Sequence, residues 1–196
     1  MGVAQARTCD IEAAKQSLEK GLLLESPSYA DLTKIGSILV LMDDAEFADP
    51  LFISAIERYP KNKYLLYRHI SHLLAGGRLL AAMDFIEAAI CRFGIEDGIL
   101  TQALKIREAV GPHCTDGNSG SGGRNGVTVC TVLNGETHGL PAFFRKAKTA
   151  ADEIVAVDPG AYQEARDLAH IFGARVFRMV DHPEFNDAWQ LASEMA

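Results

Sequence analysis

A repeat of about 34 residues runs through the first half of the chain and restricts its fold more than any other feature. Positions one repeat apart carry apolar, small or turn-forming residues in two consecutive stretches. The matching pairs are Leu32 and Leu66, Leu39 and Leu73, Ala48 and Ala82, Phe52 and Ile86, Ala55 and Ala89, and Pro60 and Gly94. Apolar residues within each stretch recur at spacings of three and four, which indicates amphipathic helices. Because one helix pair cannot bury its apolar face alone, such a repeat predicts a stack of helix pairs.

The repeat resembles that of the tetratricopeptide family, whose unit has the same length. Ala48 and Phe52 match the A-x-x-x-F part of the family pattern, and Pro60 matches its turn proline. Ile35-Gly36 stands where the family has Leu-Gly. The small alanine lets two helices approach closely, and the phenylalanine fills the groove beside it. The resemblance implies a concave groove that binds a protein or peptide partner.

We expect two full repeats and part of a third. The first repeat would cover 29–62 and the second 63–96, followed by a single helix at about 97–109. A further amphipathic helix, at about 10–24, precedes them. We therefore assign residues 1–110 to a helical, tetratricopeptide-like domain.

Residues 111–126 are dominated by glycine, serine and asparagine, and the only buriable residue among them is Cys114. This composition predicts a flexible linker. A phosphate-binding loop is the alternative, but the segment lacks G-x-x-x-x-G-K-[ST] and precedes a strand instead of following one. We therefore favour the linker.

After the linker, residues 127–196 alternate between strand and helix patterns. We expect strands at 127–133, 153–158 and 175–180, and helices at 140–151, 161–172 and 186–196. This order predicts a three-stranded parallel sheet with right-handed crossovers. The fold class of the whole chain is then α+α/β: a short helical array followed by a β-α-β-α-β-α segment, similar to half of a Rossmann-like fold.

Two stretches of this segment resemble family-two glycosyltransferases of the A-type fold. The sequence D-E-I-V-A-V-D at Asp152–Asp158 is similar to that family's D-E-I-V-V-V-D, and Phe172–Phe177 matches its F-G-A-R-V. Val127–Leu133, followed by Asn134-Gly-Glu136, is similar to the family's first strand and its K-N-E turn. The resemblance covers the segment after the linker and implies the half of the fold that binds the nucleotide of a sugar donor.

The resemblance also implies a nucleotide site beyond the carboxyl ends of the strands. Asp158 would contact the base or the ribose. Asn134 and Glu136 would line the same crevice, with Gly160 in the turn beside them. An aspartate before a Pro-Gly turn also commonly bonds to its own backbone, so a structural role for Asp158 is an equal alternative.

Several positions depart from the glycosyltransferase pattern. The family's T-G-S-T-D becomes P-G-A-Y-Q at Pro159–Gln163, which removes two hydroxyls and an acid. Leu133 replaces the turn lysine, and the metal-binding D-x-D motif and general base would lie beyond Ala196. Glycosyl transfer needs a cation to neutralise the diphosphate and a base to activate the acceptor. We therefore expect no catalytic residue, metal site or cofactor in this chain, and a divalent cation only in a longer, active form.

The composition excludes several classes of partner. The formal net charge is -7 and the pI is about 5.3, which argues against a nucleic-acid binder and against docking on anionic lipid. No apolar stretch has the length of about 18 residues that a membrane span requires. The cysteines are irregularly spaced and form no C-x-x-C, so we expect reduced thiols and a cytoplasmic location.

Three other side chains are candidates for binding. His69 and His72 lie three residues apart on one predicted helix and could bind a metal, but no acid or thiol stands at ligand spacing. We therefore expect surface or groove histidines. Trp189, which stands in place of part of the family's Arg-Asn pair, could stack on a sugar, but we favour buried packing.

The first strand should form an open edge of the sheet. In the resembled fold a fourth strand, absent here, would pair with 127–133. Both crossover helices would cover one face, and only the last helix could reach the other. Open edges and half-covered faces are association surfaces. We expect either that the helical array folds onto the sheet or that two chains pair there as a homo-oligomer.

Three functions remain open, and the missing groups favour the first. The first is a non-catalytic scaffold whose helical repeats bind a partner while the glycosyltransferase-like segment acts as a cap or dimerisation unit. The second is the donor-binding part of a family-two glycosyltransferase truncated before its metal motif. The third is a sugar-nucleotide sensor without turnover. The losses at 159–163 favour the first, because truncation alone would not change those residues.

Overall fold

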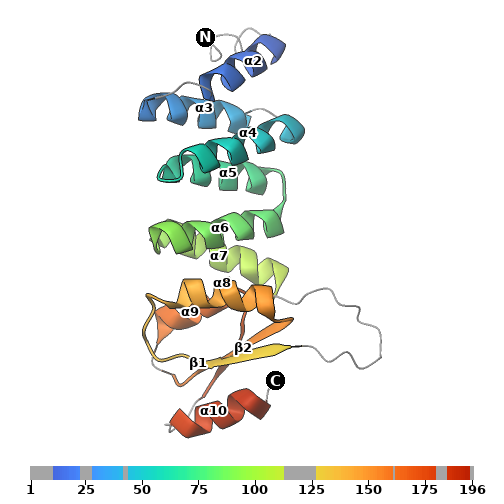
Figure 1. Ribbon diagram of the computed structural model, residues 1–196. Coiled ribbons are helices and arrows are strands. Elements are labelled where there is room, and N and C mark those ends of the chain that lie inside the picture. The colour runs from blue at the N-terminus through green and yellow to red at the C-terminus, as the bar shows by residue number, and fades with distance from the viewer. Residues whose placement is uncertain are drawn as a thin grey trace, which may run out of the picture. The chain divides into compact units, whose positions relative to one another are not determined.

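The computed structural model describes residues 11–22, 28–41, 44–112, 127–160, 162–179 and 185–194. This part of the chain is mostly helical and contains a small three-stranded parallel sheet (Figure 1). The chain divides into two compact units, residues 1–85 and 86–196. Most of the predicted linker, residues 113–126, lies outside the described residues. No described helix is both long enough and apolar enough to cross a bilayer.

The helices before the linker begin at regular intervals. They are α2 (Ile11–Leu22), α3 (Tyr29–Leu41), α4 (Ala45–Arg58), α5 (Lys63–Ala75), α6 (Leu79–Phe93) and α7 (Asp97–Val110). The starting positions of α3, α5 and α7 are separated by equal intervals, and α4 and α6 are separated by the same interval. The helix pattern predicted from the repeat is therefore confirmed at the level of its elements.

Local side-chain bonds set several of these boundaries. Asp44 accepts a bond from the Phe47 amide (3.1 Å) at the start of α4, and Asn62 caps the first turn of α5. Such caps satisfy amides that have no partner inside the helix. In the first unit, α3 packs on α5 where Gly36 lies against the Arg68 side chain.

The second unit contains the sheet. Its strands are β1 (Thr128–Val132), β2 (Glu153–Asp158) and β3 (Arg175–Arg178), and its helices after the linker are α8 (Leu140–Ala150), α9 (Gln163–Ile171) and α10 (Phe185–Glu194). The strands are parallel in the order β1-β2-β3, so β1 and β3 are both edges. The predicted parallel β-α-β-α-β-α order is confirmed.

Helices cover both faces of the sheet. Figure 1 shows α8 and α9 on one side and α10 on the other. Ala188 and Ala192 of α10 pack against Val157 of β2, and Cys130 and Val132 of β1 border the same cluster. The expectation that only the last helix reaches the second face is therefore confirmed.

The second unit also includes α7 and the second half of α6. The buried Glu87 carboxylate accepts bonds from Arg107 of α7 (3.1 Å) and Lys148 of α8 (2.8 Å). The Arg107 guanidinium also donates to the carbonyl oxygen of Ile171 at the end of α9 (2.8 Å). These bonds join helices that precede the linker to helices that cover the sheet.

Candidate functional site

The residues assigned to the nucleotide site meet at the carboxyl ends of β1 and β2. Asn134 and Glu136 lie in the exposed turn that follows β1, where the Asn134 side chain accepts a bond from the Glu136 amide (3.3 Å). Asp158 ends β2, and Gly160 follows it in the next turn. The strands are parallel neighbours, so both turns lie at the same edge of the sheet.

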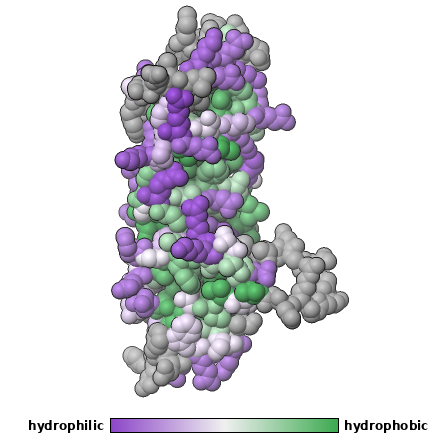
Figure 2. Space-filling view, in the orientation of Figure 1, coloured by the Kyte–Doolittle hydropathy of each residue, from purple (hydrophilic) through white to green (hydrophobic). Residues whose placement is uncertain are grey.

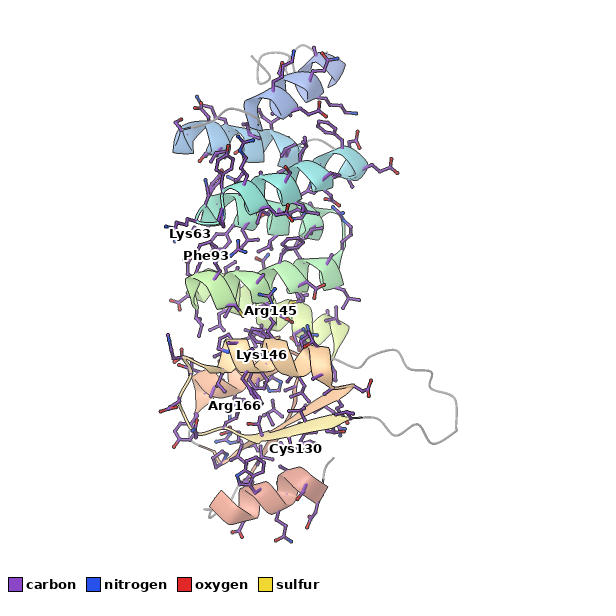
Figure 3. The ribbon with its side chains drawn as sticks, viewed as in Figure 1. Lys63, Phe93, Cys130, Arg145, Lys146 and Arg166 are labelled. Atoms are coloured by element: carbon purple, nitrogen blue, oxygen red, sulfur yellow. The ribbon has the colours of Figure 1, made fainter. Side chains whose placement is uncertain are left out.

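The Asp158 carboxylate is bonded within its own chain. The residue is fully buried (0% exposed). Its Oδ1 accepts a bond from the Gly160 amide (2.9 Å), and its Oδ2 pairs with the Arg166 guanidinium (2.8 Å). Arg166, labelled in Figure 3, comes from α9 and lies on the side of the sheet where the strands end. These contacts favour the structural alternative for Asp158, since both oxygens already have partners.

The ring of Tyr162 fills the space above the turn after β1. Gly135 has a φ of 82°, and a Cβ atom placed on it would lie 2.6 Å from the Tyr162 ring. Tyr162 stands at the fourth position of the P-G-A-Y-Q stretch that follows β2. The aromatic ring of Tyr162 therefore lies against the crevice.

The described residues contain no group of three or more histidine, cysteine, aspartate or glutamate side chains that could hold a metal ion. Cys91 and Cys130 are free thiols, and burial raises the pKa of each. A thiol with a raised pKa is a poor nucleophile at neutral pH. The described part of the second unit thus offers neither a metal centre nor an activated thiol.

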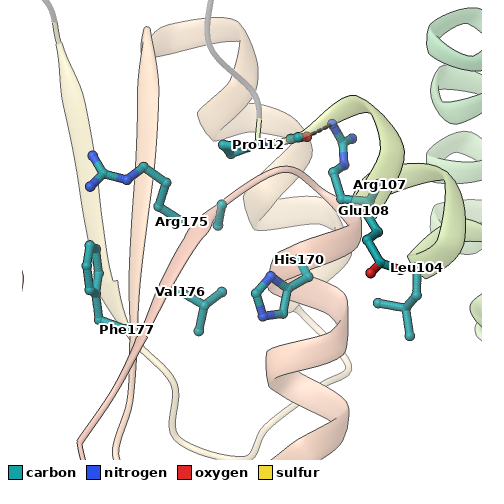
Figure 4. Close-up of a pocket in the computed structure, with 10 residues that line it drawn as sticks. Leu104, Arg107, Glu108, Pro112, His170, Arg175, Val176 and Phe177 are labelled. Atoms are coloured by element: carbon teal, nitrogen blue, oxygen red, sulfur yellow. Dashed lines mark hydrogen bonds between the residues drawn. The ribbon is translucent and has the colours of Figure 1, made fainter.

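A cavity of about 540 Å³ lies at the opposite end of the sheet (Figure 4). It is bounded by the end of α7, the end of α9 and the start of β3. Leu104, Val176 and Phe177 give it apolar walls, and burial lowers the pKa of His170 beside them. Sequence reasoning missed this cavity because its walls come from segments on both sides of the predicted linker.

The seam between α3 and α5 in the first unit holds an arginine in a fixed position. The Nε atom of Arg68 donates to the hydroxyl of Tyr64 (2.7 Å), and its guanidinium lies 4.8 Å from the centre of the Tyr64 ring. Ser37 of α3 bonds the same hydroxyl (3.0 Å). No acidic side chain of the described residues pairs with Arg68. A half-buried guanidinium positioned in this way is suited to binding an anion.

A hollow of about 510 Å³ lies in the same unit, where α4 ends and α5 begins. It is lined by Leu32, Tyr59, Pro60, Lys61 and Asn62. The lining combines an apolar floor with one exposed lysine. The turn proline of the repeat pattern, Pro60, is part of this wall.

The prediction of surface or groove histidines is wrong. His69 and His72 are buried (1% and 7% exposed), and the Nε2 atom of each lies 3.5 Å from Asp49. Burial lowers the pKa of His69 to about 4, against the opposing charge of Asp49. Asp49 itself forms a two-bond ion pair with Arg78. Sequence spacing gave no signal, because Asp49 lies on the preceding helix, α4.

The histidine cluster is packed among aromatic rings. Phe52 stacks on His69 at 5.0 Å, and Phe85 contacts the same ring edge-on at 4.4 Å. A neutral imidazole in such surroundings serves packing.

Trp189 is 41% exposed, so the prediction that its side chain is buried is wrong in extent.

No protein-family model matches the sequence, and no curated protein matches it either.

Proposed function

We propose that this protein is a non-catalytic scaffold whose tetratricopeptide-like repeats bind an acidic segment of a partner protein. Residues 127–196 are related to the nucleotide-binding half of family-two glycosyltransferases but serve as a structural unit. The observation that carries the proposal is Arg68, which Tyr64 holds on the α3–α5 seam without an acidic partner among the described residues.

The state of the nucleotide crevice supports a role other than sugar transfer. Asp158 is bonded to Gly160 and Arg166, and Tyr162 lies against Gly135. A donor nucleotide would have to displace the ring and compete with Arg166 for the carboxylate. Both changes would cost binding energy, because buried polar groups left without partners are destabilising.

The charges of the first unit support an acidic partner. Lys61 is exposed beside the hollow lined by Leu32 and Tyr59, and Lys34 is exposed on α3. The whole chain carries a net charge of -7, so an acidic partner would have to bind through these few cations. Guanidinium groups bind carboxylates through paired hydrogen bonds, and lysines at the edge of a site mainly raise the association rate.

Fluorescence anisotropy with the full chain tests this proposal. The probe is a short labelled peptide of alternating aspartate and alanine, titrated at low and physiological salt. We expect Arg68→Gln to weaken binding about tenfold or more, because it removes the charged fork. The matched control is Lys105→Gln, the same loss of charge on an exposed residue of α7, which should change the affinity by less than about twofold.

Two results would overturn the proposal. The first is equal binding by the wild type and by Arg68→Gln. The second is saturable binding of uridine diphosphate with Mn²⁺ in calorimetry, which would favour the donor-binding alternative. Asp158→Ala is a poor test of that alternative, because the side chain also holds the fold together.

A further inference from the structure

The outer edge of β1 carries backbone groups without a partner among the described residues. The Leu133 amide donates to the Val157 carbonyl (2.9 Å), and the Val127 carbonyl accepts from the Asp152 amide (2.8 Å). In a parallel sheet, every second residue of a strand forms its backbone hydrogen bonds with the same neighbouring strand. The N–H and C=O groups of the odd-numbered residues therefore point towards β2. The N–H and C=O groups of Thr128, Cys130 and Val132 therefore point away from the sheet.

The two edges of the sheet differ in their protection. The outer strand β3 begins and ends with exposed arginines, Arg175 and Arg178. Charged side chains on an edge strand discourage pairing with other chains. The β1 sequence, T-V-C-T-V, has no charge and is made of β-branched residues around one cysteine. Its own residues therefore include neither a charge nor a proline to protect the edge.

Apolar side chains surround the same edge. Val127, directly before β1, is 54% exposed. In Figure 2, hydrophobic residues reach the surface over the part of the second unit where Figure 1 draws β1. Trp189, which is 41% exposed, belongs to α10, and that helix packs across β1 and β2. Pairing along β1 would remove part of this apolar area from water.

We propose that β1 pairs with β1 of a second copy of this chain, antiparallel and centred on Cys130. Figure 3 places Cys130 in the middle of the strand. Because Cys130 is the central residue of β1, a two-fold axis can pass beside it, with Thr128 of one copy opposite Val132 of the other. Each of the three pairs would exchange two backbone bonds, and the two sheets would join as β3-β2-β1-β1-β2-β3.

A second copy fits this edge better than a charged partner segment. The strand is uncharged, so self-pairing brings no like charges together. The two-fold axis also places both α10 helices, each with its exposed Trp189, on the same face of the joined sheet. This inference does not depend on the proposed function of the helical repeats.

Sedimentation equilibrium of the full chain over about 1–100 μM is the first test, a range that spans weak association. We expect a reversible dimer of twice 21.3 kDa. Residue-resolved hydrogen exchange at the two ends of that range gives the position of the interface. We expect the amides of Thr128, Cys130 and Val132 to become protected at high concentration, while the outward-facing amide of Val176 in β3 does not.

A matched pair of proline variants tests the edge directly. Thr128→Pro removes an outward N–H that bonds nothing in its own sheet, and an edge strand tolerates proline at its first residue. We expect it to weaken dimerisation about tenfold or more, because two of the proposed bonds disappear. Val176→Pro makes the equivalent change on the outer edge of β3 and should leave the dimer unchanged.

Three outcomes would overturn the inference. They are a monomer at the highest concentration, a dimer without protection of the β1 amides, and equal weakening by both proline variants. If the chain is monomeric, a strand from another protein is the remaining candidate partner for the edge of β1. If Thr128→Pro fails to fold, as judged by circular dichroism, the exchange measurement on the wild type decides.

Discussion

At the scale of single residues, Asp158 stabilises the turn that follows β2. Its carboxylate, fully buried, accepts bonds from the Gly160 amide and from Arg166. We predict that Asp158→Ala lowers the free energy of unfolding by about 2–3 kcal/mol, because it leaves a cation and an amide unpaired. Asp158→Asn should cost less, since its side-chain oxygen still accepts from Gly160. Urea unfolding measures both, and Asp167→Ala, which removes an exposed bond to Gln163 and a charge near His170, is the control.

The lowered pKa of His69 determines the direction in which the free energy of unfolding changes with pH. Burial lowers the pKa of His69 to about 4, whereas the ordinary value is 6.5. Between these values the unfolded chain binds a proton that the folded chain does not. Stability should therefore fall as the pH falls from 6.5 towards 4, by up to about 1.4 kcal/mol per pH unit.

The variant His69→Leu removes this titration and should reduce the slope of the stability profile across that window, while the lowered pKa of His170 leaves part of the slope in place. Urea unfolding at intervals from pH 7 to pH 4 gives the slope, and NMR titration of the His69 ring gives the pKa directly. The pKa of Asp49 is a separate contribution. Burial acts to raise it, but the bond and charge of Arg78 outweigh burial and hold it below 3.8, outside this window. An unchanged slope in His69→Leu would contradict the assignment.

At the scale of elements, the turn after β1 depends on the ring that covers it. Gly135 and Gly94 have nearly the same positive φ, 82° and 84°, but a Cβ on Gly94 would meet nothing within 4 Å. We predict that Gly94→Ala costs about 1 kcal/mol, from backbone strain alone. Gly135→Ala should cost at least about 1 kcal/mol more, because its Cβ would collide with Tyr162.

A double-mutant cycle separates the two contributions at Gly135. In a Tyr162→Ala background the collision is absent, so Gly135→Ala should cost no more than Gly94→Ala. Chemical unfolding of the four proteins of the cycle provides the measurement. Equal costs of Gly135→Ala with and without Tyr162 would mean that the ring does not hold its place over the turn.

The elements themselves were predictable because each one depends on its own stretch of sequence. The strand expected at 153–158 is found at Glu153–Asp158, since a short apolar run rich in β-branched residues favours a buried strand. Helix ends differed by a few residues, as they depend on local caps. The sequence did not reveal the partners of these elements. Asp49 beside His69 and Tyr162 against Gly135 are contacts made by the folded chain, and no spacing rule encodes them.

At the scale of the whole molecule, the position of α7 affects which fragments of the chain can fold independently. The sequence assigns α7 to a domain that ends at residue 110, whereas the second compact unit contains it. The reason is an ion cluster: Glu87, only 4% exposed, bonds both Arg107 and Lys148. A buried carboxylate between two cations is stable only while every member has its partners.

We predict that a fragment of residues 79–196 folds cooperatively and that a fragment of residues 127–196 does not. The shorter fragment lacks Glu87, so Lys148 loses its carboxylate, and without Arg107 the Ile171 carbonyl loses its donors. The apolar surface of α9 that α7 covers would also be exposed to water. The measurement is the urea transition of each fragment followed by circular dichroism. As a control, Glu87→Gln in the longer fragment should lower its stability by about 2–4 kcal/mol, because two cations lose their countercharge. A cooperative transition in the 127–196 fragment would instead show that the sheet and its own three helices are sufficient.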